Sequence, residues 1–346
     1  MTLVSALLLV LLGSVASYCW LSFLLRQNSS ILVPDTPNTR SLHSQVVPRG
    51  GGLVIVVSTA SLIGIYQAIC QSIAVMQVLI ALLVGCIAVL GWFDDRNNLR
   101  IRSRIIVQFV VACGMVYLLA RFQGINIAGY RLEQPYWLLF VVLVVWIVWV
   151  TNLFNFMDGI DGLVATQSII ASIILAFWFH HADAPGLVLL NLTLAGTLIG
   201  FTILNWRPAQ VFLGDIGSLS LGIYFAVMGV IGWIEYHLAV EAFLLLYGVM
   251  LCDSSVTLAV RMFRGERWWE AHSSHYYQRL VGVGYNHAQV TLFAVVITLS
   301  LSIYGTFVIY KIGPGWLWIT LGLATLATCG LTVRAKEQMY VDEDEK

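Results

Sequence analysis

The sequence predicts an all-α, polytopic membrane protein with about eleven transmembrane helices, in a range of roughly ten to twelve. Of the 346 residues, 59% are hydrophobic and only 10% are charged, whereas a typical soluble domain is about one-quarter charged. Such a chain cannot cover itself with a water-compatible surface. Apolar stretches of spanning length recur along it, and its basic residues gather in alternate connections between those stretches.

A helix that crosses the hydrocarbon core needs about 20 mostly apolar residues, because lipid offers no partners to backbone polar groups. The first such stretch is expected to be a retained helix and not a secretory signal, since no Lys or Arg precedes Arg26. We expect a single integral membrane domain over 1–335 and a charged cytoplasmic tail at 336–346, whose last residues, VDEDEK (341–346), form a frayed, solvated end. The predicted spans are 2–25, 51–70, 74–93, 104–121, 136–151, 163–181, 186–204, 217–234, 238–260, 288–310 and 315–333.

The basic residues predict the orientation, because Lys and Arg accumulate in short cytoplasmic loops. With the N-terminus outside and the C-terminus in the cytoplasm, all of the eighteen Lys and Arg are cytoplasmic except Arg121, Arg131 and Lys311. The net charge of zero argues against a nucleic-acid binder, which needs a basic excess. Six cysteines without paired spacing predict neither a zinc site nor a disulfide framework.

Polar residues and glycines concentrate on the predicted cytoplasmic side. A lipid-facing protein has no structural need for so many polar, glycine-bearing loops on one face, so they predict a functional site at that boundary. The segments are HSQVVPRGGG (43–52), DDRNNLRIRSR (94–104), NLFNFMDGIDG (152–162), NWRPAQVFLGDIGS (205–218) and RMFRGERWWEAHSSHYYQRL (261–280).

Asp94 and Asp95 end the third predicted span. Neighbouring helical side chains diverge by about 100°, so the two carboxylates should serve different purposes, one in chemistry and the other in structure or metal binding. The nearby arginines suit a phosphate, since guanidinium groups bind it bidentately, but retention of positive charge in the cytoplasm explains them equally well. These arginines are Arg96, Arg100, Arg102 and Arg104.

Asn152, Asn155, Asp158 and Asp161 follow one another at a spacing of three. A glycine follows each aspartate, which favours a helix that ends, turns and restarts. Amide and carboxylate oxygens are suitable ligands for Mg²⁺, which takes one or two protein ligands and completes its shell with water and substrate phosphates. The alternative is a polar helix terminus that caps itself.

Asp215 lies between Gly214 and Gly217, just before a predicted span with Ser218 as its N-cap. The N–H groups of that helix terminus favour an anion such as a diphosphate, and Asp215 could hold its cation. An ordinary helix cap is the alternative. His272 and His275 lie on one face if this loop is helical, but without HExxH or a third ligand they suit phosphate contact better than zinc.

In this order, the five loops resemble the polyprenyl-phosphate N-acetylhexosamine 1-phosphate transferases, a family that includes phospho-N-acetylmuramoyl-pentapeptide transferase. The most specific pieces are DD at 94–95, NxxNxxDGxDG at 152–162 and GDxGS at 214–218. PRGGG at 48–52 and HSSHYYQRL at 272–280 are most similar to the branch that initiates O-antigen or other surface polysaccharides.

The resemblance implies roles for residues of this chain. Asp94 and Asp95 are the expected catalytic pair, with Asp94 deprotonating or positioning the lipid phosphate. Asp215 and Asn155 are expected to hold Mg²⁺, with Mn²⁺ as the alternative cation, on the nucleotide diphosphate. The remaining expected substrate contacts are His43, Arg49, Arg102, Arg104, Asn152, Asp158, Asp161, His272 and His275. Asn98 departs from the family, where many members have a third aspartate, and HSSH is a sparser histidine cluster than others carry.

The implied reaction moves an N-acetylhexosamine 1-phosphate from a UDP-sugar to undecaprenyl phosphate and releases UMP. It would be the first step of O-antigen or related surface polysaccharide synthesis in a bacterial inner membrane, catalysed at the cytoplasmic face. The oligomeric state is left open, with a homodimer as one alternative. The sequence does not identify the transferred sugar. Use of the same chemistry in the synthesis of peptidoglycan or another envelope glycan is an alternative. A secondary transporter is the rival class, but charged residues near the bilayer midplane are missing apart from Asp253, and no inverted repeat is evident.

Overall fold

The computed structural model describes residues 3–37, 42, 45–70, 75–119, 125–127, 130–132, 136–267, 269–270 and 272–344. Helices dominate these residues, and two short antiparallel hairpins join some of them. The helices are α1 (Leu3–Arg26), α2 (Gly52–Ile69), α3 (Val75–Asn97), α4 (Ile101–Leu118), α5 (Tyr136–Phe156), α6 (Leu163–His181), α7 (Pro185–Asn205), α8 (Gly214–Ile234), α9 (Val240–Leu246), α10 (Gly248–Phe263), α11 (Tyr276–Gly282), α12 (His287–Ile309) and α13 (Gly315–Asp344). The hairpins are β1 (Val33–Asp35) with β2 (Val47–Arg49), and β3 (Ile125–Ile127) with β4 (Tyr130–Leu132).

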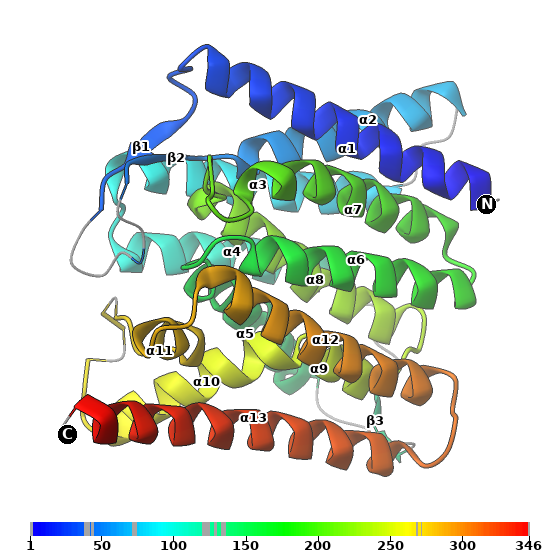
Figure 1. The fold of residues 1–346 in the computed structure, drawn as a ribbon. Coiled ribbons are helices and arrows are strands. Elements are labelled where there is room, and N and C mark those ends of the chain that lie inside the picture. The colour runs from blue at the N-terminus through cyan, green and yellow to red at the C-terminus, as the bar shows by residue number, and fades with distance from the viewer. Residues whose placement is uncertain are drawn as a thin grey trace.

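The predicted fold class is confirmed. Among the described residues, 10 helices are long and apolar enough to cross a bilayer, or 11 if α9 and α10 form one span. These two helices meet at a bend of 77°, so the span predicted at 238–260 is broken. Figure 1 shows the long helices side by side in one bundle, with the two chain ends at opposite ends of it.

The helix α8 forms the centre of the bundle. It packs against α2, α3 and α5, and nearly all of its side chains are buried. Small residues allow these helices to approach closely, as expected where lipid removes the hydrophobic drive between helices. A Cβ on Gly222, for example, would lie 2.7 Å from the Cα of Thr151 in α5. By contrast α1, at the edge of the bundle, exposes Leu7 and Leu11 where lipid would cover them.

Two local expectations are wrong. Ser218 is not an N-cap, because α8 begins four residues earlier at Gly214 and the Ser218 hydroxyl donates to the Gly214 carbonyl oxygen (3.1 Å). The last span does not end at 333, and the frayed end expected at 341–346 is helical as far as Asp344, since α13 continues to that residue; its Glu337 accepts a hydrogen bond from Arg279 Nε (2.5 Å). The helix α8 thus begins earlier, and α13 ends later, than the residue pattern had predicted.

We predict opposite effects for two glycine substitutions in α3. A Cβ on Gly91 would lie 2.4 Å from the Ile216 Cα of α8, whereas a Cβ on Gly85 would meet nothing within 4 Å. Gly91→Ala should therefore lower the unfolding free energy by about 1–3 kcal/mol through overpacking. Gly85→Ala should leave it unchanged or raise it by up to about 1 kcal/mol, because alanine favours helix. Thermal unfolding in detergent measures both, and equal shifts would contradict the close α3–α8 contact.

Candidate functional site

The polar loops meet at one end of the bundle around a cavity of about 230 Å³. We call this the acidic cavity, because five of its lining residues are aspartates, contributed by four separate segments. The five polar loops expected to converge all contribute lining residues here, although Arg49 and Gln278 are 229 positions apart in the chain (278 − 49). The aspartates are Asp35, Asp95, Asp158, Asp161 and Asp215, and the lining also includes Arg49, Asn155, Phe212, Gln278 and His287.

Asp94 lies between α4 and the first turn of α8, with its carboxylate beside that of Asp215. It is buried, forms an ion pair with Arg104 (Oδ2 to Nη1, 2.8 Å) and accepts a hydrogen bond from the backbone N–H of Leu99 (2.8 Å). Because both oxygens have partners, this carboxylate fixes the start of α4 and the position of the Arg104 guanidinium. Asp94 thus contacts both Arg104 and Asp215, although it is not among the residues that line the cavity.

Asp95 contacts the backbone of the first turn of α8. Its carboxylate accepts the backbone N–H groups of Asp215 (3.0 Å) and Ile216 (3.2 Å), and it lies 3.4 Å from Arg49 Nε. A carboxylate at a helix N-terminus satisfies donors that have no partner within the helix, and the helix dipole favours it. The two adjacent aspartates thus have different partners, and Asp95 holds the backbone at the start of α8; their separate roles stay a prediction.

The glycines of PRGGG bring β2 against the loop that precedes α8. The N–H of Phe212 donates to the Pro48 carbonyl (2.8 Å), and the N–H of Gly52 donates to the Leu213 carbonyl (2.9 Å). A Cβ on Gly52 would lie 2.1 Å from the Cα of Gly217, so a side chain cannot occupy this position without moving α8. The close approach explains the run of small residues and places the preceding arginine at the cavity.

A chain of hydrogen bonds joins α4, α5 and α8 across the site. Arg104 Nη2 donates to Asn155 Oδ1 (3.2 Å), and Asn155 Nδ2 donates to Asp215 Oδ1 (2.5 Å) and to Ser218 Oγ (3.0 Å). Asn155 therefore contacts Asp215 directly, as the expected metal pair requires. Its oxygen faces Arg104 in this arrangement, and turning the amide over would present that oxygen on the Asp215 side.

Asp158 lies in the turn between α5 and α6, where the predicted break in the helix is confirmed. Burial raises its pKa well above the usual range, and the negative charges of Asp215, Asp95 and Asp35 raise it further. The cavity thus holds more negative charge than its own arginines offset, which is the condition that a bound cation relieves.

Asp161 is held by the start of α12. Its carboxylate lies 3.2 Å from His287 Nδ1 and accepts the N–H of Ala209 (3.3 Å), while its carbonyl oxygen accepts from Thr291 Oγ1 (3.0 Å). His287 also lines the cavity, although it was not among the site residues expected from the sequence. The available signal was its place beside Asn286 at the start of a span on the site's side of the bundle.

His272 and His275 do not line the acidic cavity. The expectation that both histidines lie on one face of a helix is wrong, because α11 begins only at Tyr276. His275 is buried with Nδ1 3.1 Å from Asp253, and the two histidine rings stack at 4.8 Å. Burial, followed by the charges of His275 and Arg261, lowers the pKa of His272 to about 4, so it is uncharged near neutral pH.

Asp253, noted in the sequence only as an isolated charge, anchors α11. Besides contacting His275, its carboxylate accepts the N–H groups of Tyr276 (2.9 Å) and Tyr277 (3.0 Å). The Tyr277 hydroxyl then donates to the Phe156 carbonyl at the end of α5 (3.0 Å). The His272–His275 loop is thereby fixed against the segment that carries Asn155 and Asp158.

The other expected contacts lie farther out. Asn152 donates to Gln108 Oε1 (2.6 Å) and lies one turn of α5 below the cavity lining. Arg102 is exposed on α4. His43 lies outside the described residues.

The donor set fits a magnesium ion better than a transition metal. Among the described residues, no three His, Cys, Asp or Glu side chains stand in metal-ligand geometry. A transition-metal site would need such a group, whereas Mg²⁺ needs only one or two protein ligands when substrate phosphates supply the rest. Asp215 and Asn155, in a cavity with excess negative charge, meet that requirement.

Part of this chain is similar to a known protein family. Residues 75–233 match the family model described as glycosyl transferase family 4. This segment belongs to that family. It contains Asp94, Asn155, Asp158, Asp161 and Asp215, and the resemblance to the polyprenyl-phosphate hexosamine 1-phosphate transferases is confirmed.

Three relatives show how far the similarity extends along this chain. The chain is 28% identical over 292 residues to the "Probable undecaprenyl-phosphate N-acetylglucosaminyl 1-phosphate transferase" of Bacillus subtilis, covering 82% of this chain and 78% of that one. It is 28% identical over 286 residues to the phospho-N-acetylmuramoyl-pentapeptide-transferase of Carboxydothermus hydrogenoformans (77% and 86%). The enzyme of that name from Acaryochloris marina is 28% identical over 244 residues (67% and 64%).

We predict that Asp158→Asn stabilises the protein in a pH-dependent way when divalent cations are absent. A folded-state pKa raised above the unfolded value means that the charged carboxylate costs stability, and this cost disappears as pH falls and Asp158 takes up a proton. The variant should unfold at a higher temperature than wild type at pH 8, and the difference should shrink toward pH 5. The exposed Asp183→Asn is the control. A difference independent of pH would contradict the crowding of negative charge.

Proposed function

We propose that this protein transfers an N-acetylhexosamine 1-phosphate from a UDP-sugar to undecaprenyl phosphate, giving undecaprenyl-diphosphate-sugar and UMP. The hydrogen-bonded chain from Arg104 through Asn155 to Asp215 carries the proposal, because it unites three separate segments at an acidic cavity at the end of a membrane bundle. The family match and the printed activities of the relatives support it.

The reaction forms one phosphorus–oxygen bond and breaks another. An oxygen of the lipid phosphate attacks the phosphorus that carries the sugar, and the bridging oxygen leaves with its electron pair as part of UMP. A phosphate and a diphosphate repel each other, so positive charge must offset their approach. Arg49 and Arg104, held by Asp95 and Asp94, supply fixed guanidinium groups at the cavity and beside it.

Asp215 and Asn155 would hold Mg²⁺, or Mn²⁺ in its place, and the ion would neutralise the nucleotide diphosphate. Asp94 positions or deprotonates the lipid phosphate, working beside Arg104. Asp158 and Asp161 orient the nucleotide or sugar, with His287 holding Asp161. His272 and His275 act at the edge of this site, where a neutral His272 can form hydrogen bonds to phosphate without adding charge.

The proposed setting is a bacterial inner membrane, with the acidic cavity at the cytoplasmic face, the N-terminus outside and the C-terminus inside. This orientation puts the cavity where nucleotide sugars are made, and the positive-inside distribution of basic residues supports it. The proposed pathway is the start of O-antigen or a related surface polysaccharide. Peptidoglycan synthesis is the second candidate, because relatives of both kinds cover about three-quarters or more of this chain.

We predict that purified protein, given undecaprenyl phosphate and a panel of UDP-sugars, forms a lipid whose mass exceeds the acceptor by one sugar phosphate. Asp215→Ala and Asp94→Asn should each lower turnover by at least about a hundredfold. The first removes the carboxylate proposed to hold the cation at the reacting phosphates, and the second removes the negative charge that holds the Arg104 guanidinium. Asp183→Asn, at an exposed site in another loop, should keep wild-type turnover. Near wild-type turnover in both site variants would refute the assignment, and a product bearing a pentapeptide would select the peptidoglycan candidate.

Removal of divalent cations should stop the transfer. We expect excess EDTA to abolish product formation and added Mg²⁺ or Mn²⁺ to restore it, because Asp215 and Asn155 cannot neutralise a diphosphate by themselves. Thermal unfolding in the same buffers is the control, since EDTA should leave the folded state intact. Full activity in EDTA would remove the cation from the proposal.

A further inference from the structure

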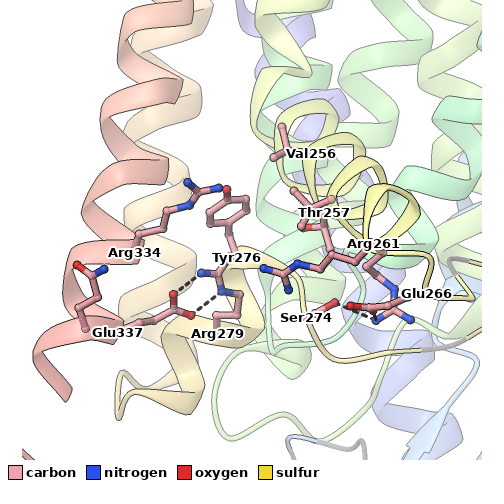
Figure 2. Close-up of a pocket in the computed structure, with 12 residues that line it drawn as sticks. Val256, Thr257, Arg261, Glu266, Ser274, Tyr276, Arg279, Arg334 and Glu337 are labelled. Atoms are coloured by element: carbon pink, nitrogen blue, oxygen red, sulfur yellow. Dashed lines mark hydrogen bonds and ion pairs between the residues drawn. The ribbon is translucent and has the colours of Figure 1, made fainter. Parts of the chain in front are cut away.

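A second cavity, of about 590 Å³, lies on the opposite side of α11 and shares no lining residue with the acidic cavity. Figure 2 shows it between α10, α11 and α13, with guanidinium groups from all three helices directed toward it. We call it the basic cavity. Its charged lining residues are Arg261, Arg264, Arg279, Arg334, Glu266 and Glu337.

Two of the four arginines are neutralised within the cavity wall. Arg261 pairs with Glu266 (2.8 Å), and Arg279 donates from both Nε and Nη2 to the Glu337 carboxylate (Figure 2). Arg264 and Arg334 form no ion pair with any described residue. The basic cavity therefore has two uncompensated positive charges, which favour an anionic occupant.

An apolar groove continues from the basic cavity into the bundle. This groove, of about 370 Å³, lies between α10, α12 and α13, and it shares Val256, Tyr276 and Arg334 with the basic cavity. Side chains such as Phe293 and Leu326 line its length. Asp253 also lines the groove, but its carboxylate is already held by His275 and by the backbone N–H groups of Tyr276 and Tyr277. Positive charge at one end and a mainly apolar lining along the rest match an amphiphile with an anionic head, whereas free phosphate would leave the groove unused.

We propose that the basic cavity binds the phosphate headgroup of an anionic bilayer phospholipid, with an acyl chain in the adjoining groove. Basic pockets between transmembrane helices at a membrane surface bind such headgroups through charge and hydrogen bonds. This lipid is a resident ligand and differs from the polyprenyl acceptor, whose phosphate must reach the acidic cavity. The inference does not rest on the proposed transfer reaction.

The bound lipid would stabilise the position of α11. This helix stands between the two cavities, with Arg279 on the basic side and Gln278 on the acidic side. The Tyr277 hydroxyl bonds to the Phe156 carbonyl, so α11 also contacts the end of α5. A headgroup behind α11 would therefore support one wall of the acidic cavity.

The test is native mass spectrometry of the full chain in detergent, titrated with dioleoyl phosphatidylglycerol and, separately, with dioleoyl phosphatidylcholine. Each positive charge near an anionic lipid contributes roughly fivefold in affinity. The double variant Arg264→Gln, Arg334→Gln should thus bind phosphatidylglycerol about 25-fold more weakly than wild type. The matched control Lys336→Gln, an exposed cation on α13 that does not line the cavity, should bind within about twofold of wild type.

A second variant keeps the charges and fills the groove. Leu326→Trp should weaken phosphatidylglycerol binding without changing the Arg264 and Arg334 guanidinium groups, so it tests the site even if the double variant fails to fold. Equal phosphatidylglycerol binding by wild type and both variants would overturn the proposal. Displacement of the lipid by inorganic phosphate would overturn it in favour of a free-anion site. If the variants instead raised the KM for undecaprenyl phosphate and left phosphatidylglycerol binding unchanged, the basic cavity would be a site for the acceptor lipid and the proposal would be wrong.

Discussion

The contact between the Asp95 carboxylate and the first turn of α8 is the interaction on which the rest of the site depends. It joins the end of one span to the start of another, satisfies two backbone donors at a helix N-terminus and pairs with Arg49. Because α8 is the central helix, fixing its first turn also fixes Asp215 relative to α5. One buried carboxylate thus links the packing of the bundle to the geometry of the acidic cavity.

Much of this arrangement could be predicted from the sequence, because lipid imposes strict rules on composition. Spans follow from apolar length, and the loop 152–162 breaks the helix where Asp-Gly recurs, as α5 and α6 confirm. The close contact of Asn155 with Asp215 was also expected, but only through the family resemblance. Hydropathy alone places loops at a boundary and gives no information about which loops touch.

The features that could not be predicted for His275, His287 and the α9–α10 bend depend on contacts between residues far apart in the sequence. The burial of His275 depends on Asp253 in another helix, and no local pattern shows that pairing. His287 reaches the cavity only because α12 begins beside the 158–161 turn. The bend between α9 and α10 likewise has no proline or charge to mark it, although it determines where Asp253 stands. Sequence periodicity describes one helix at a time, whereas these features belong to pairs of helices.

The separation of charge around α11 is itself a physical argument for two kinds of ligand. Like charges gathered in a low-dielectric setting are costly unless counter-ions arrive, so uncompensated charge in a membrane protein is retained where binding requires it. The acidic cavity carries aspartates that favour a cation and its phosphates, whereas the basic cavity carries arginines that favour an anion. Only a short helix divides them. If the two sets of charges merely balanced each other, they would pair directly across α11, yet Arg264 and Arg334 have no carboxylate partner among the described residues.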